Sequence, residues 1–132
     1  MSGALVLDSE GLAKAVQRDQ EVHEWLMAAR DADLPVITSA AVLVEVIHPR
    51  INDAALKWTL SRLRVEPVTQ AVAQSAAVLL RGAGLHGHKY AIDAMLCATA
   101  LAQPGRVTIL TSDVEDVEML TVEHARVVAE KV

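Results

Sequence analysis

Short apolar runs alternate with longer amphipathic stretches along the chain. The runs at 4–7, 34–38, 65–68 and 107–111 predict buried strands. Between them, apolar residues recur every three or four positions, which is typical of helices with one buried face. The predicted helices cover residues 12–30, 40–48, 53–63, 69–81, 91–102 and 114–120. The last apolar run, at 125–129, fits a strand or a helix equally well.

Residues that favour turns and caps mark the ends of these elements. Ser39 fits the N-cap of the helix over 40–48, and Pro49 ends that helix. Gly82 and Gly84 end the helix over 69–81. The stretch "GLHGHKY", residues 84–90, is predicted to be a loop.

Strands separated by helices predict one fold class. Such strands pair in parallel through right-handed helical crossovers, which gives a three-layer α/β/α sandwich with a mainly parallel central sheet. The 132 residues contain no linker, internal repeat or low-complexity tract, so we expect one domain over 1–132. Ligands of such sheets bind beyond the carboxyl ends of the strands.

Composition sets the character of the core and the expected compartment. With no Phe, two Trp and one Tyr, the core must be aliphatic. The single cysteine, Cys97, lies in an apolar run and is expected to be a buried free thiol in a reducing compartment. The sequence shows no signal-peptide pattern and no apolar stretch of about 18 residues. We therefore expect a cytoplasmic protein that does not enter the membrane.

Five acidic residues lie within apolar sequence or directly after it: Asp8, Glu45, Asp93, Asp113 and Asp116. Each has a simple structural explanation. An Asp after a strand can cap or charge the next helix, Asp93 can favour a helix N-terminus through the macrodipole, and Glu45 can occupy an exposed stripe. Taken together, however, they come from four elements that converge at one edge of the predicted sheet.

Carboxylates gathered at one edge repel each other unless a cation neutralises them. Oxygen ligands of this kind suit Mg²⁺ or Mn²⁺, and no Cys or His spacing supports zinc. A metal site predicts that the carboxyl groups of four of these residues lie within about one coordination shell of each other. These residues are Asp8, Glu45, Asp93 and Asp113.

Four segments, "LVLDSEGL", "SAAVLVEV", "AIDAMLCATAL" and "ILTSDVED", make the chain similar to PIN-domain ribonucleases, and specifically to VapC-type toxins of toxin–antitoxin pairs. The resemblance extends from Leu5 to the C-terminal run "ARVVAEKV", which it implies is the last strand. Each motif is unspecific alone; their order and spacing make the combination specific. The chain departs from the family pattern after Asp8, where Ser9 is followed by the charged Glu10.

The resemblance implies roles for individual residues. Asp8, Glu45, Asp93 and Asp113 match the family's metal-binding acids, and Asp116 matches a further acid found in many members. In the expected chemistry, Glu45 would bind or orient water as a general base, and Asp116 would help to hold a second ion. Thr111, or with less support Ser112, matches a hydroxyl group that faces the phosphate or supports the metal ligands. The implied activity is Mg²⁺- or Mn²⁺-dependent hydrolysis of RNA. The implied partners are a cognate antitoxin and a second copy of the chain in a homodimer.

The formal net charge of −5 argues against a broad nucleic-acid interface. Without the five acids of the predicted site, however, the rest of the chain is neutral. Basic residues near the site are then candidates to contact RNA, above all Arg50, Arg81 and Lys89, and also Lys57, Arg62 and Arg64. Each also fits an ordinary surface charge.

Two other functions stay open. A non-catalytic PIN-fold module that binds RNA or protein would keep the architecture without the metal. A phospho-acceptor or phosphatase domain with Asp8 as nucleophile would need a second Asp two residues later, where this chain has Glu10. P-loop and dinucleotide-binding folds are excluded because no Gly-rich turn links a strand to a helix.

Overall fold

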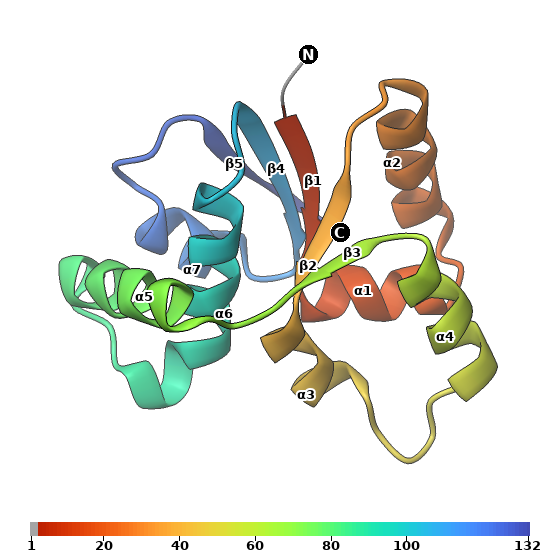
Figure 1. The fold of residues 1–132 in the computed structure, drawn as a ribbon, viewed down its shortest axis with the longest axis horizontal. Helices are drawn as coiled ribbons and strands as arrows, with labels where there is room; N and C mark the ends of the chain where they lie inside the picture. The colour runs from red at the N-terminus through yellow and green to blue at the C-terminus, as the bar shows by residue number, and fades with distance from the viewer. Residues whose placement is uncertain (1–2) are drawn as a thin grey trace.

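The computed structural model describes residues 3–132, in which a central sheet lies between two layers of helices (Figure 1). Within these residues the sheet has five strands: β1 (Gly3–Leu7), β2 (Val36–Ser39), β3 (Arg64–Glu66), β4 (Arg106–Thr111) and β5 (Val127–Lys131). Their order is β3-β2-β1-β4-β5, and every neighbouring pair is parallel. The predicted α/β/α sandwich is confirmed, and the undecided run at 125–129 contributes to a strand.

The helices divide between the two faces of the sheet. They are α1 (Ser9–Val16), α2 (Gln20–Asp31), the 3₁₀ turn η1 (Ala40–Val42), α3 (Leu43–Val46), α4 (Asp53–Ser61), α5 (Gln70–Ala83), α6 (Gly87–Leu101) and α7 (Val114–Leu120). Helices α1 and α2 pack on β1, and α4 packs on α1. On the other side α6 packs on β2 and β4, with α5 and α7 against it (Figure 1).

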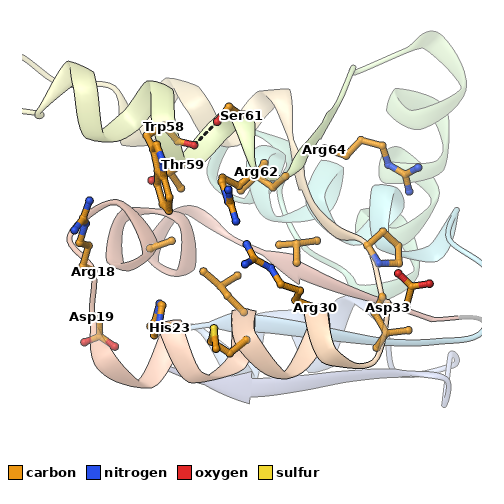
Figure 2. Close-up of a pocket in the computed structure, with 17 residues that line it drawn as sticks. Arg18, Asp19, His23, Arg30, Asp33, Trp58, Thr59, Ser61, Arg62 and Arg64 are labelled. Carbon is orange, nitrogen blue, oxygen red and sulfur yellow. Dashed lines mark hydrogen bonds between the residues drawn. The ribbon is translucent and has the colours of Figure 1, made fainter.

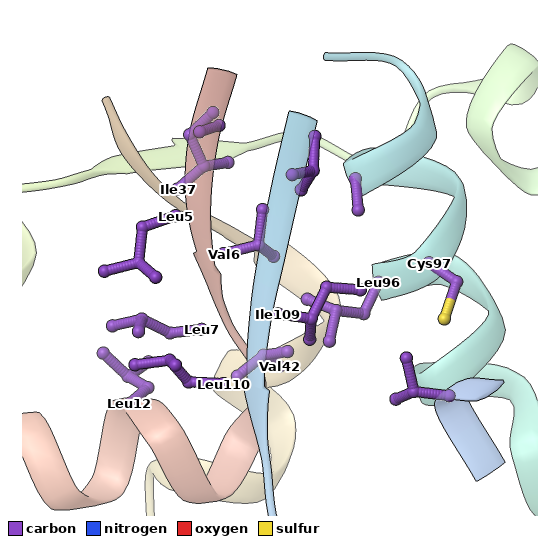
Figure 3. Packing of buried hydrophobic residues seen from close by; sticks show 14 of the residues in the cluster. Leu5, Val6, Leu7, Leu12, Ile37, Val42, Leu96, Cys97, Ile109 and Leu110 are labelled. Carbon is purple, nitrogen blue, oxygen red and sulfur yellow. The ribbon is translucent and has the colours of Figure 1, made fainter. Parts of the chain in front are cut away.

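The core is aliphatic, as the composition predicts, and side chains of the strands pack into it on both faces of the sheet (Figure 3). Successive side chains of a strand point to opposite faces. Leu7 and Leu110 therefore pack near Leu12 of α1, whereas Ile109 packs near Leu96 of α6 (Figure 3). All are fully buried. Because both faces are covered, the strands are almost continuously apolar.

Cys97 lies in the α6 layer of this core as a buried free thiol, which confirms the prediction. Burial raises its pKa to about 12, with smaller contributions from the charges of Asp93 and Asp8. The side chain is therefore an uncharged, inert packing group.

The single helix predicted over 12–30 is wrong, because the chain forms two helices there. Arg18 adopts a left-handed backbone with a φ of 61°. Asp19 then caps α2 by accepting a hydrogen bond from the Val22 N–H at 3.1 Å. The apolar periodicity continues through this turn because both helices bury one face against the same side of the sheet.

Two other predicted boundaries are also wrong. The loop predicted at 84–90 contains the first turn of α6, which starts at Gly87 and packs on α5. This turn forms although Gly87 has low helix propensity, and α6 is kinked at Tyr90, which has non-helical φ and ψ angles. The helix predicted over 40–48 is capped by Ser39 as expected but ends at Val46. Gly82 lies inside α5, and Gly84, at a φ of 66°, ends it.

A candidate acidic site at the carboxyl edge of the sheet

The central strands β1 and β4 bring the first predicted site residues to the same edge. Their register pairs Leu7 with Leu110, so Asp8 and Thr111 follow at the carboxyl ends of neighbouring strands. Within the sheet, β2 and β3 lie to one side of β1, and β4 and β5 lie to the other side. This point, where the strand order reverses, is where open α/β sheets bind ligands.

Asp8 is a buried carboxyl, with 6% of the residue exposed. Its side chain caps α1 by accepting a hydrogen bond from the Gly11 N–H at 2.8 Å, so the capping explanation for Asp8 is correct. Burial is the main cause of its raised pKa, and the charge of Asp113 adds to it. Hydrogen bonds from the Gly11 N–H and the Thr111 side chain act in the opposite direction.

The pKa of Asp93 shows most directly that the other acids lie close to it. It lies half-buried in α6, and its pKa is raised from 3.8 to about 6. Burial is the largest cause, followed by the negative charges of Asp113, Asp116, Glu45 and Asp8. The structure therefore brings the other four predicted acids close enough to repel a charge on Asp93. Asp93 also lies three residues beyond the kink at Tyr90, so its helix-dipole explanation stays open.

Glu45 is exposed on α3, in agreement with the exposed-stripe explanation, yet it faces this edge of the sheet. Its carboxylate accepts a hydrogen bond from the Ser9 hydroxyl, directly after Asp8. Ser9 is a site residue that sequence reasoning missed. The only signal was its position, since a hydroxyl group beside a strand-end Asp is common at helix starts.

Asp113 occupies the N-cap position of α7, but its side chain makes no capping hydrogen bond, so its carboxylate is not used as a cap. The Asp113 N–H donates to the Thr111 hydroxyl at 2.8 Å. Thr111 is fully buried and so supports both Asp8 and the backbone of Asp113. Asp116 lies half-buried in the first turn of α7, and Ser112 is also half-buried.

The strict form of the metal-site prediction is wrong. In residues 3–132, no three or more His, Cys, Asp or Glu side chains are close enough to hold a metal ion in common. Two local causes are visible, since Asp8 is held by its cap on α1 and Glu45 by Ser9. Mutual repulsion also separates carboxylates when no cation lies between them. The donor chemistry nevertheless fits Mg²⁺, which keeps several waters and takes only one or two carboxylates directly.

The basic residues predicted to contact RNA lie on the surface in three different elements. Arg50 follows α3, Arg81 is in the last turns of α5, and Lys89 is in the first turn of α6. Lys89 also lies 5.2 Å from the centroid of the Tyr90 ring. Their RNA-binding role stays a prediction. No helix in residues 3–132 is long and apolar enough to cross a membrane.

The arrangement of strands and helices matches solved structures over almost the whole chain. A chain of VapBC2 from Rickettsia felis, bound to a promoter DNA fragment, matches with a TM-score of 0.68 over 98% of both chains at 15% identity. A toxin–antitoxin complex from Klebsiella pneumoniae matches with a TM-score of 0.67 over 98% of this chain and 100% of the other, at 20% identity. DNA-bound VapBC from Salmonella typhimurium matches with a TM-score of 0.62 over 97% of both chains, at 14% identity.

This chain has a PIN-like fold. The resemblance predicted from the four sequence motifs is thereby confirmed at the level of architecture. No protein-family model matches the sequence. A comparison with curated proteins gives no significant match either. The roles of individual residues must therefore be argued from the geometry of the acidic edge.

Proposed function

We propose that this protein is a metal-dependent endoribonuclease that hydrolyses RNA phosphodiester bonds, and that a cognate antitoxin holds it inactive. The observation that carries the proposal is the electrostatic environment of Asp93. Burial raises its pKa, and four other carboxylates at the same edge of a parallel sheet raise it further. Repulsion among the five acids destabilises the folded protein. Such an arrangement is expected where the acids bind a divalent cation.

The residues divide into metal-holding and water-orienting groups. Asp8, Asp93 and Asp113 would hold an Mg²⁺ or Mn²⁺ ion directly or through waters, and Asp116 would help to hold a second. A bound ion of this kind lowers the pKa of water and neutralises charge on the phosphate.

Glu45 would orient the attacking water and accept its proton, while the Ser9 hydroxyl fixes the carboxylate of Glu45. Thr111 positions the backbone of Asp113 through its hydroxyl group. Ser112 is the second candidate for a hydroxyl that faces the phosphate.

The proposed antitoxin partner and homodimer are inferred from the similar solved structures. The similar structures are toxin–antitoxin assemblies, one of them bound to promoter DNA. By analogy, an antitoxin would cover the acidic edge, and two copies of the chain would associate. A basic side chain of such a partner would offset the repulsion among the five acids in the same way as a cation does.

Cleavage of RNA tests the proposal. Purified protein should cut an end-labelled pool of structured RNAs when Mg²⁺ or Mn²⁺ is present, and stop when EDTA removes the ion. Asp93→Asn should lower the rate by roughly 100-fold or more while the protein stays folded. Glu118→Gln is the matched control, because it removes an exposed acid of α7 outside the proposed site. Full activity in Asp93→Asn, or cleavage that persists in EDTA, would contradict the proposal.

The second candidate is a PIN-fold interaction module without catalysis. It is favoured by the lack, in the described residues, of three acids within reach of one metal ion. Wild-type protein that neither binds Mn²⁺ nor cleaves any RNA in the pool would support this module instead.

A further inference from the structure

A groove with a cavity of about 930 Å³ lies between α2 and α4, in the helix layer that α1 shares (Figure 2). Four arginines line it: Arg18, Arg30, Arg62 and Arg64. They come from the turn before α2, from α2, from the end of α4 and from β3. A third of the twelve basic residues of an acidic protein therefore surround one groove.

Three of these guanidinium groups have no acidic partner. Among residues 3–132, the only ion pair joins Arg64 to Glu66, at 2.9 Å. Arg30 and Arg62 reach into the groove from opposite walls and face each other (Figure 2). Two acids also line the groove. Asp19 uses its carboxylate to cap α2, and Asp33 forms no ion pair with the four arginines. Two facing cations without a counter-ion favour an anionic ligand between them.

Trp58 adds an aromatic surface at the same place. It is an exposed large apolar residue, at 55%, on a wall of the groove. The guanidinium carbons of Arg18 and Arg62 lie 5.6 and 5.1 Å from the centroid of its ring. These cation–π contacts hold two planar cations in place before any ligand arrives. A cationic groove with an aromatic surface is the arrangement that proteins use to bind single-stranded nucleic acids.

A second cavity, of about 500 Å³, lies next to this groove. It shares Arg18 with the groove and is also lined by Arg50 and by Val46, the neighbour of Glu45. Helix α1 has Asp8 at one end and Arg18 just past the other. Its eight residues span about 12 Å. At about 3.4 Å per nucleotide, a strand would reach the groove a few nucleotides from the acids.

We propose that the α2–α4 groove binds a single-stranded segment of the RNA substrate a few nucleotides from the cleaved bond. Arg18, Arg30 and Arg62 contact its phosphates, and bases stack against the groove wall around Trp58. The inference rests on the proposed ribonuclease function for the identity of the ligand. An acidic peptide would also satisfy the arginines, but it would not use the exposed aromatic surface of Trp58 as stacked bases do.

Binding without cleavage tests this site. The probe is a fluorescein-labelled random-sequence RNA of about 20 nucleotides, long enough to cover groove and acidic edge, with affinity measured by anisotropy in EDTA. Arg30→Gln/Arg62→Gln should weaken binding roughly tenfold or more and reduce the slope of log affinity against log salt by about 1.4. Arg30→Lys/Arg62→Lys should restore part of the affinity, because it keeps both charges.

The matched control is Arg106→Gln/Lys131→Gln, which removes two exposed charges that line neither cavity. It should leave RNA affinity within about twofold of the wild type. Thermal melts should be the same for all variants, since every substituted side chain is exposed.

Unchanged RNA affinity in Arg30→Gln/Arg62→Gln would overturn the proposal. If that variant also lost affinity for a poly-glutamate peptide, the groove would be assigned to an acidic partner instead. Wild-type protein that binds RNA through these arginines but never cleaves it would contradict the ribonuclease function alone. Cleavage that does not depend on the groove would contradict this inference alone.

Discussion

Among single residues, Asp93 gives the strongest support for the proposed acidic site, because its pKa is raised by burial and by the other four acids. Asp93 lies on α6, directly before the buried part of that helix, so its backbone position is fixed by packing of the helix against the sheet. A carboxyl whose pKa is higher in the folded state than in the unfolded chain keeps its proton more firmly when folded. Between about pH 3.8 and 6 the folded state therefore binds more protons, and stability falls as pH rises through this window.

Asp93→Asn should remove this loss of stability. Without divalent ions, the variant should exceed the wild type by about 1–3 kcal/mol in unfolding free energy above pH 6, because an amide carries no charge there. The difference should shrink as the pH falls toward 4. Urea unfolding at a series of pH values in EDTA measures it. A difference that stays constant across this range would show that folding does not raise the pKa of Asp93.

Sequence could predict that the five acids lie near one another, because each lies within an apolar run or directly after one. Ser9 could not be predicted as a site residue, because its contact with Glu45 joins positions 36 residues apart. Sequence also could not show that Asp8 and Glu45 are held by other groups. For the same reason, the predicted convergence into one metal shell was too strict.

At the scale of elements, the close approach of α1 to β4 places Asp8. Gly11 permits it, because a Cβ at this position would lie 3.0 Å from the Leu110 carbonyl oxygen and 3.5 Å from the Asp8 carboxylate. The neighbouring carbonyl belongs to a central strand and cannot move easily. The first turn of α1 and the end of β4 are therefore packed backbone to backbone.

Gly11→Ala should destabilise the protein by about 1–2 kcal/mol, although alanine favours helices, because overpacking outweighs propensity here. Gly82→Ala is the matched control inside α5, where an added Cβ meets nothing within 4 Å. It should stabilise the protein by about 0.5–1 kcal/mol. Thermal or urea unfolding of both variants measures the pair. If both substitutions stabilised the protein, the proposed close packing of α1 on β4 would be wrong.

The type of most elements could be predicted from the apolar pattern, whereas several boundaries could not. The turn at Arg18 carries no glycine or proline, so nothing in the pattern marks the division between α1 and α2. The first turn of α6 forms against α5 despite two glycines nearby. In both cases tertiary packing outweighs local propensity.

At the scale of the whole molecule, residues of opposite charge gather in two separate places. The carboxyl edge of β1 and β4 gathers five acids, and the α2–α4 groove gathers four arginines. The net charge of −5 conceals this division. In the proposed function, the groove would bind the RNA strand, and a divalent cation would neutralise the acids of the carboxyl edge.

The most direct test of the central claim is a crystal structure with Mn²⁺, recorded at a wavelength where manganese scatters anomalously. We expect an anomalous peak at the carboxyl edge, about 2.0–2.2 Å from at least one carboxylate oxygen of Asp8, Asp93 or Asp113 and completed by waters. The peak should be absent in Asp93→Asn. A wild-type structure in saturating Mn²⁺ with no peak at this edge would contradict the account.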